Sequence, residues 1–244
     1  MELTPIAFAQ SPYKEKFAIP RQPGLVPSAH TRVTLIADFC HQQALDGLEQ
    51  VSHVWLIFGF HAVGSRPDSL RVRPPRLGGN TRIGVFATRS THRPNGLGQS
   101  LVKIETIDND TLIVSGADLL DGTPIYDIKP YVPYADALTD AENHMAPAPP
   151  NVIRVEWSPD ARAQAEHAQQ RLQDKVLAVI EESLAQDPRP AYQNKQNSNQ
   201  QSNHDSEREY GVRLWDLNVR WHYPTNECAR VISVLPIDNE QSEK

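Results

Sequence analysis

Three segments of the sequence are dense in side chains that bind anions or exchange protons. In residues 17–24 (FAIPRQPG), two prolines enclose Arg21 and Gln22 in a stiff loop that can present backbone groups to a ligand. In residues 73–100, a predicted strand leads into a loop of prolines and glycines, and such loops are where functional sites concentrate. The polar side chains in that loop are Arg89, Ser90, His92, Arg93 and Asn95.

The third segment, residues 116–136 (GADLLDGTPIYDIKPYVPYAD), sets carboxylates and one lysine among turn residues and tyrosines. Tight turns capped by aspartate account for Asp121 and Gly122, but not for Lys129-Pro130-Tyr131. The other carboxylates of the segment that could exchange protons are Asp118 and Asp127. Residue types alone therefore predict an arginine-rich, tyrosine-bearing cleft for an anionic ligand that can stack, such as a nucleotide.

The distribution of charge agrees with an anionic partner, although the net charge of −6 alone argues against nucleic acid. From Arg66 to Arg93 there are seven arginines and a single acid, Asp68. A run of arginines can be a solvated face, but a surplus this one-sided favours a surface that contacts phosphates. The RNA contacts predicted from it are Arg71, Arg73 and Arg76, with Arg93, Asn95 and Tyr131 from the neighbouring segments.

Several classes of protein are not supported by the sequence. Only Cys40 and Cys228 are present and no signal segment opens the chain, so we expect a reducing cytoplasm. The longest apolar run, Val54 to Phe58, is far shorter than a membrane span, so we expect no membrane partner. His53 and His61 would share one face of a strand, but no third ligand is suitably spaced, so we expect no metal. Glycine motifs for a Rossmann site or a P-loop are absent.

The elements that must position these residues are mostly short strands. Prolines and glycines break the first 150 residues into pieces that suit a mainly β (α+β) fold, with an antiparallel barrel-like domain. The predicted strands are Val33 to Phe39, Val51 to His61, Arg82 to Thr88, Leu101 to Ile107, Thr111 to Gly116 and Ile125 to Tyr131. Residues 146–150 (APAPP) predict a stiff linker, so we expect domains at 1–145 and 151–244.

A smaller α+β region is predicted after this linker. Apolar residues alternate from Ile153 to Trp157, and Ser158-Pro159 is a typical helix start. One helix is expected from Ser158 to about Ala185, followed by a disordered loop at 193–209, which has no apolar residue. Two closing strands are expected, from Trp215 to Trp221 and from Val231 to Leu235.

The three segments, together with VSHVW at 51–55 and DPRPAY at 187–192, resemble the TsaA-like (YaeB/TrmO) family over nearly the whole chain. The stretches GVFATRSTHRPN and DGTPIYDIKPYVPYAD carry the resemblance most specifically. The resemblance implies a homodimeric β-barrel enzyme that uses S-adenosyl-L-methionine to methylate N6-threonylcarbamoyladenosine at position 37 of tRNA, in the anticodon stem-loop. It implies cofactor contacts at Gln22, Pro23, Gly24, His61, Ala62, Arg89, Gln99, Ser115, Gly116, Ala117 and Asp118.

The implied chemistry assigns roles to the remaining polar residues. The threonyl carboxylate of the substrate calls for a cation, for which Arg89, Arg93 and Lys129 are candidates. Asp118 or Asp127 could accept the proton that N6 loses or could bind donor groups on the cofactor, and Tyr131 or Tyr134 could stack on the base. Two alternatives remain at this point: a non-catalytic tRNA-binding module, and a hydrolase of a small anionic nucleotide.

Overall fold

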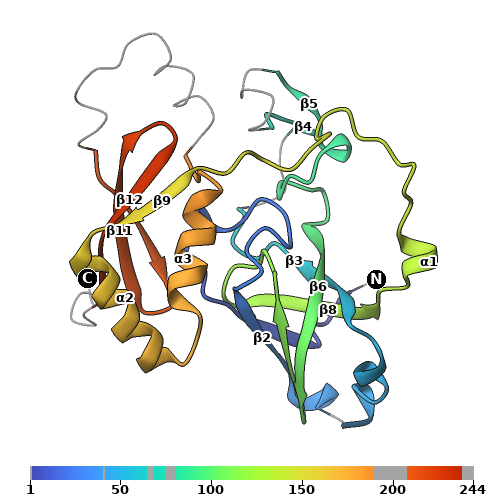
Figure 1. Ribbon diagram of the computed structural model, residues 1–244. Coiled ribbons are helices and arrows are strands. Elements are labelled where there is room, and N and C mark those ends of the chain that lie inside the picture. Colours follow the sequence, from blue (N-terminus) through green and yellow to red (C-terminus); the bar gives the residue numbers. More distant parts are fainter. Residues whose placement is uncertain (1, 41, 65–68, 75–80, 190–207, 238–244) are drawn as a thin grey trace.

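The computed structural model describes residues 2–40, 42–64, 69–74, 81–189 and 208–237. It consists of a closed β-barrel and, beside it, a sheet covered by two helices (Figure 1). The predicted mainly β class, with a smaller α+β region toward the C-terminus, is confirmed.

The barrel is antiparallel, and its strands follow one another around the wall in the order β1, β2, β7, β6, β3, β8. Their bounds are β1 (Ala7–Gln10), β2 (His30–Leu35), β3 (His53–Gly59), β6 (Leu97–Asp108), β7 (Thr111–Ser115) and β8 (Thr123–Pro130). On β3, Val54, Leu56 and Phe58 are buried, because alternate side chains of a strand point to one face. The residues between them therefore face out of the barrel.

Short 3₁₀ turns connect the barrel strands. They are η1 (Lys16–Ala18), η2 (Ala37–Phe39), η3 (Gln42–Ala44), η4 (Leu48–Gln50) and η6 (Val85–Ala87). The prediction of a strand from Arg82 to Thr88 is wrong for most of its length. Only β5 (Ile83–Gly84) is extended, and it pairs with β4 (Arg71–Val72) outside the barrel. The turn forms instead because both the amide and the hydroxyl of Thr88 donate to the carbonyl oxygen of Val85.

After β8, a single turn of helix, α1 (Pro133–Asp136), leads into an exposed segment that crosses to the second unit (Figure 1). That unit is a four-stranded sheet in the order β10, β11, β12, β9. The bounds are β9 (Arg154–Trp157), β10 (Tyr210–Leu214), β11 (Leu217–Thr225) and β12 (Cys228–Pro236), with α2 (Pro159–Leu172) and α3 (Val176–Ala185). The predicted helix cap is confirmed, since Ser158 Oγ accepts from the amide of Ala161 over 3.1 Å.

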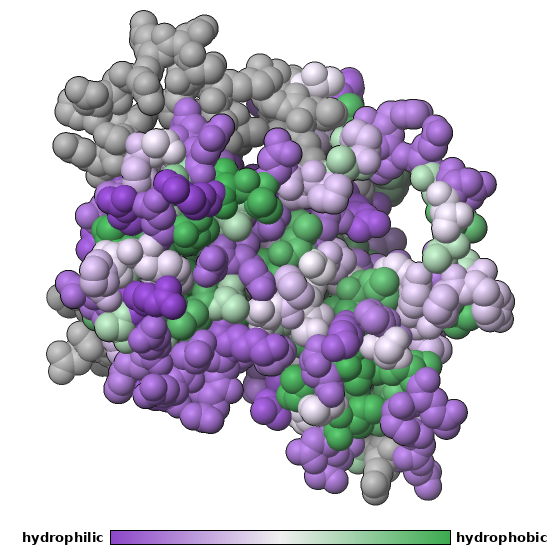
Figure 2. All heavy atoms as spheres, viewed as in Figure 1, coloured by the Kyte–Doolittle hydropathy of each residue, from purple (hydrophilic) through white to green (hydrophobic). Residues whose placement is uncertain are grey.

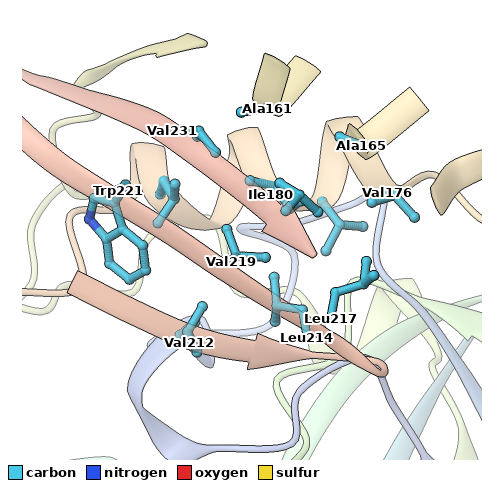
Figure 3. Close-up of a cluster of buried hydrophobic side chains, with 14 of the residues drawn as sticks. Ala161, Ala165, Val176, Ile180, Val212, Leu214, Leu217, Val219, Trp221 and Val231 are labelled. Carbon is cyan, nitrogen blue, oxygen red and sulfur yellow. The ribbon is translucent and has the colours of Figure 1, made fainter. Parts of the chain in front are cut away.

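The core of this unit lies between the helices and the sheet. Figure 3 shows Ala165, Val176 and Ile180 on the helices and Val219 and Leu217 on β11 meeting in one buried cluster. The exposed side of α2 is hydrophilic (Figure 2). The same cluster includes side chains from the N-terminal part of the chain, so the two units share buried surface. These are Tyr13, Ala18, Val26 and Ala29.

The prediction of one helix from Ser158 to Ala185 is wrong. Helix α2 ends at Leu172, because the next residue, Gln173, takes a left-handed φ of 53°. The carboxylate of Asp174 then accepts from the amide of Lys175 over 2.8 Å, and such a local bond competes with helix continuation. The break lets α3 fold back onto α2, so both apolar stripes cover the same sheet.

The prediction that Trp215 begins a strand is also wrong. Trp215 has a φ of 51° and lies in the tight turn that joins β10 to β11. The predicted strand at Val231 to Leu235 is confirmed within β12. The segment for which a disordered loop was predicted, 193–209, lies outside the described residues except for Arg208 and Glu209.

Candidate active site

A cleft of about 1160 Å³ lies against the barrel wall, lined by the loop at 16–27, by β3, by the first half of β6 and by the end of β7. Loops held by a rigid scaffold are where sites concentrate. Most of the residues predicted to contact the cofactor line this cleft: Gln22, Pro23, Gly24, His61, Ala62, Arg89, Gln99, Ser115, Gly116 and Asp118. Ala117 belongs to the same turn, but its side chain is fully buried in the barrel core.

Two glycines bring the loop at 16–27 against the end of β7. The amide of Gly24 donates to the carbonyl oxygen of Gly116 over 2.8 Å, and both residues have positive φ, of 79° and 74°. A Cβ added at Gly116 would lie 3.3 Å from the Cα of Gly24. Glycine is needed at Gly116 because other residues disfavour this backbone conformation and because the two backbones approach closely.

A half-buried carboxylate lies in the cleft wall. Asp118 follows β7 and accepts a hydrogen bond from Oγ of Ser100 on β6, and Ser100 is fully buried. Burial raises the pKa of Asp118 above its usual value, although the hydroxyl of Ser100 and the charge of Arg89 act in the opposite direction. A carboxylate with a raised pKa is a stronger base than an exposed one, which suits it to accept a proton.

Arg89 also lines the cleft and is exposed. Its Nη1 donates to Oε1 of Gln22 over 2.5 Å, which joins the loop after η6 to the loop at 16–27. Arg93 also lines the cleft, but its Nη1 donates to the carbonyl oxygen of Thr88 over 2.8 Å. Arg93 therefore supports the loop that carries Arg89.

Asp127 and Lys129 do not line the cleft, although they lie next to one of its walls. On β8, they pair in register with Ile57 and Trp55 of β3, and both of these β3 residues line the cleft. The carboxylate of Asp127 and the ammonium of Lys129 form an ion pair of 2.9 Å on this exposed surface. Tyr131 follows on the same side, with its ring centroid 6.0 Å from that of Trp55 in an edge-to-face arrangement.

The other predicted RNA contacts in the described part of the chain do not line the cleft. Arg71 is exposed on β4, and its Nη2 donates to the carbonyl oxygen of Arg82 over 2.7 Å. Arg73 and Asn95 are exposed as well, whereas Arg76 lies outside the described residues. Tyr134 on α1 is 92% exposed, so it could contact a ligand only from outside the cleft.

Sequence reasoning missed several residues of the site. Ser100 is the hydrogen-bond partner of Asp118, and Lys16, His53, Trp55 and Ile57 line the cleft. The only signal for Ser100 in the sequence was a polar residue at an inward position of β6. Its carboxylate partner depends on strand register, which the sequence does not give. His53, Trp55 and Ile57 are alternate residues of β3, which the sequence predicted as a strand, whereas nothing in the sequence singled out Lys16 in η1.

Two general features of the described residues bear on function. No group of three His, Cys, Asp or Glu side chains among them is arranged to hold a metal ion, and His53 and His61 both line the cleft. None of the helices in the described part is long and apolar enough to cross a membrane.

Comparison with known proteins matches both parts of the chain to one family. The family model of the tRNA-methyltransferase O N-terminal domain matches residues 8–137, and that of the TrmO C-terminal domain matches 150–237. The crystal structure of TrmO from Pseudomonas aeruginosa has a TM-score of 0.81 and 49% identity, covering 96% of this chain and 98% of that one.

Named relatives agree with this match. The tRNA (adenine(37)-N6)-methyltransferase of Escherichia coli strain K12 is 46% identical over 224 residues, which are 88% of this chain and 90% of the relative. The protein RcsF of Pseudomonas aeruginosa is 56% identical over 232 residues, which are 95% of this chain and 96% of that protein. S-adenosylmethionine-dependent methyl transfer has been suggested as its activity.

The barrel, its cleft and these matches define the class of the protein as the β-barrel tRNA methyltransferases. The chain belongs to the tRNA-methyltransferase O family. The resemblance seen in the sequence is confirmed.

Proposed function

We propose that this protein transfers a methyl group from S-adenosyl-L-methionine to N6 of N6-threonylcarbamoyladenosine at position 37 of tRNA. The observation that carries the proposal is the half-buried carboxylate of Asp118, with its raised pKa, in a cleft that Arg89 also lines. Family membership supports the reaction class, and the names of the relatives give tRNA adenine 37 as their own target.

The donor set of the cleft fits S-adenosylmethionine. When bound, S-adenosylmethionine supplies an electrophilic methyl group on its sulfonium sulfur. The arginines that line the cleft match its carboxylate, and apolar side chains such as Ile57 and Leu97 match its adenine ring. Backbone groups near Gly24 and Gly116 would complete the pocket. Neither glycine has a side chain that could cover these groups.

The chain's own residues divide the remaining tasks. Asp118 accepts the proton that N6 loses, because burial raises its pKa toward the working pH. Arg89 binds the threonyl carboxylate, because its planar guanidinium offers paired N–H donors. Lys129 and Asp127, one strand away from the cleft wall, bind polar groups of the nucleotides next to the target.

RNA binding beyond the cleft is assigned to the arginines on and near β4. Arg71 and Arg73 are exposed and can contact phosphates of the anticodon stem-loop. The half-buried ring of Tyr131, beside Trp55, is a platform on which a base can stack. Arg93 and Asn95 lie on the loop between η6 and β6 and are assigned to the same RNA.

Two further features are proposed. The protein acts as a homodimer, since Tyr134 and Leu138, 92% and 70% exposed, are large apolar side chains that a second copy could cover. It works in the cytoplasm, because its substrate is tRNA. Sedimentation analysis at several concentrations tests the first of these, and tagged-protein microscopy tests the second.

The experiment that tests the function is nucleoside mass spectrometry. Purified protein is incubated with S-adenosylmethionine and with tRNA from a strain that lacks the homologous methyltransferase. We expect the threonylcarbamoyladenosine nucleoside to gain one methyl group on N6. Binding of tRNA without any methylated product would contradict the methyltransferase activity and support a non-catalytic tRNA-binding module.

A further inference from the structure

We infer that the buried ion pair of Asp187 and Arg189, in the C-terminal region, positions the cofactor-binding loop of the barrel and acts through Arg21. Asp187 and Arg189 are positioning residues in this scheme, since neither lines the cleft. The inference rests on the proposed function for its effect on cofactor binding. Its effect on the loop itself can be measured separately.

The ion pair fixes the turn that follows α3. The guanidinium of Arg189 donates from Nε and Nη2 to the two carboxylate oxygens of Asp187, over 2.7 and 2.9 Å. Its Nη2 also donates to the carbonyl oxygen of Asn226 over 3.0 Å, and its Cζ lies 3.8 Å from the ring centroid of Tyr223. Arg189 is 4% exposed. The turn is therefore held from several directions.

This turn presents its backbone carbonyls to the barrel. Nη2 of Arg21 donates to the carbonyl oxygens of Asp187 and Arg189, over 3.4 and 3.1 Å. Arg21 is in the loop at 16–27 and lines the cleft, and its neighbour Gln22 accepts from Arg89. A continuous set of contacts thus runs from the buried ion pair to the arginine at the cleft mouth.

Separate contacts anchor the two ends of the same loop. At one end, the ring of Phe17 stacks on Trp221 of β11 with centroids 6.0 Å apart. At the other, the amide and hydroxyl of Ser28 donate to the carboxylate of Glu182 on α3, over 2.9 and 2.7 Å. Because both ends are held independently, loss of the Arg21 contact should loosen the middle of the loop without detaching it.

The cost of burying charge also favours a positioning role. A buried ion pair contributes little net stability, because desolvation of both charges offsets their attraction. A pair that holds a turn in one geometry can still be useful where that turn must present acceptors to a partner. The carbonyls that receive Arg21 are those of the two ion-paired residues themselves.

The test combines two substitutions with a matched control. Arg21→Met keeps the stem of an exposed side chain and removes its donors, and Arg189→Lys keeps the charge but loses the bidentate fork. The control, Arg171→Met, breaks the bidentate pair of Arg171 with Asp216 in the same region, over 2.7 and 2.8 Å, and leaves the contacts of Arg21 and of the turn at 187–189 intact. Amide hydrogen exchange at Gly24 is measured without any cofactor, and affinity for S-adenosylmethionine is measured by calorimetry.

We expect Arg21→Met and Arg189→Lys each to accelerate exchange at Gly24 and to weaken cofactor binding about tenfold, roughly the effect of one lost hydrogen bond. KM for the cofactor should rise while kcat changes little. The double variant should be no worse than the singles, because both act through one contact. Arg171→Met should leave Gly24 exchange and cofactor affinity unchanged.

Unchanged exchange at Gly24 in Arg21→Met overturns the inference, and so do additive effects in the double variant. If Arg189→Lys does not fold, comparison of Arg21→Met with Arg21→Lys tests the inference. The lysine ammonium can still donate to a carbonyl of the turn, so Arg21→Lys should keep part of the protection at Gly24 that Arg21→Met loses. If the unmodified protein binds no S-adenosylmethionine, the proposed function fails, while the exchange data still test the positioning role.

Discussion

Arg89 donates a hydrogen bond to Oε1 of Gln22 over 2.5 Å, although 67 residues separate the two along the chain. The contact uses Nη1, one of the five N–H donors that a guanidinium has. Arg89 also lowers the pKa of Asp118 through its charge, although burial of Asp118 has the larger, opposite effect. Gln22 thus orients a cation that faces both the proposed proton acceptor and the open mouth of the cleft.

Replacing Gly116 by alanine should weaken cofactor binding by separating two backbones. The new Cβ would lie 3.3 Å from the Cα of Gly24, and the residue would keep its φ of 74° at a cost of about 1–2 kcal/mol. Urea unfolding measures the cost in stability, and calorimetry with S-adenosylmethionine measures affinity. Gly47→Ala is the control, because Gly47 has a φ of 91° with no atom near its Cβ position. Equal affinity in both variants would contradict the prediction.

Asp118→Asn should abolish most activity yet leave the protein at least as stable at neutral pH. Burial raises the pKa of Asp118 in the folded chain above its usual 3.8. At pH values between the pKa of the unfolded chain and that of the folded chain, the folded chain therefore binds more protons than the unfolded one. Stability of the unmodified protein therefore falls as pH rises through the folded pKa, whereas the asparagine variant lacks this loss. The thermal midpoint of the variant, relative to the unmodified protein, should be higher at pH 8 than at pH 4. A constant difference would contradict the assignment.

Ser100→Ala should shift the pH dependence of methyl transfer in a defined direction. The hydroxyl of Ser100 lowers the pKa of Asp118, so its loss should raise that pKa further. Because the ionised carboxylate is the base, activity falls as pH decreases through this pKa. The acidic limb of the kcat/KM profile should therefore move to higher pH in Ser100→Ala. An unmoved limb would show that another group accepts the proton.

Neutralising Arg71 or Arg73 should weaken tRNA binding and flatten its dependence on salt. Each phosphate contact that is lost should reduce the slope of log K against log salt by roughly 0.7 to 0.9. Affinity for S-adenosylmethionine should stay the same, since neither arginine lines the cleft. Arg162→Gln is the control, because Arg162 pairs with Glu166 on the exposed side of α2. The same comparison extends to Arg76, and an unchanged slope in all three would contradict the proposed RNA surface.

The sequence predicted those parts of the fold in which one local rule dominates. The strand at Val54 to Phe58 follows from a run of apolar residues, and the helix start follows from Ser158 and Pro159. Strand β1 escaped prediction because two of its residues, Ala7 and Ala9, are alanines with little strand preference. The helix break at Gln173 escaped it because the apolar stripe continues across the break.

The site was predictable only as a set of segments. Residue types and resemblance brought Gln22, Arg89 and Asp118 into one proposed cleft, and the structure places all three there. The partner of Asp118 could not be predicted, because it depends on the register of β6 against β3 and β7. The contact of Arg21 with the turn at 187–189 joins residues more than 160 positions apart, which no local pattern specifies.

The last prediction concerns substrate order: the enzyme should act on tRNA that already carries threonylcarbamoyl at its adenosine and should leave plain adenosine unmodified. A carboxylate bound to Arg89 gains a charge-assisted contact on the order of 1.5 to 3 kcal/mol that plain adenosine cannot make. Discrimination is larger still if donors at the cleft mouth are left without a partner when the plain nucleoside binds.

Arg89→Lys tests the source of this discrimination, because lysine keeps the charge but loses the planar fork. The variant should reduce the rate on modified tRNA by more than it reduces overall tRNA affinity, which depends mainly on phosphate contacts elsewhere. Arg89 also lines the proposed cofactor cleft, so S-adenosylmethionine affinity is measured on the same variant to separate the two effects. Comparable rates on unmodified transcripts and on threonylcarbamoylated tRNA would refute the proposed substrate, because the cation at the cleft mouth would then have no carboxylate to select.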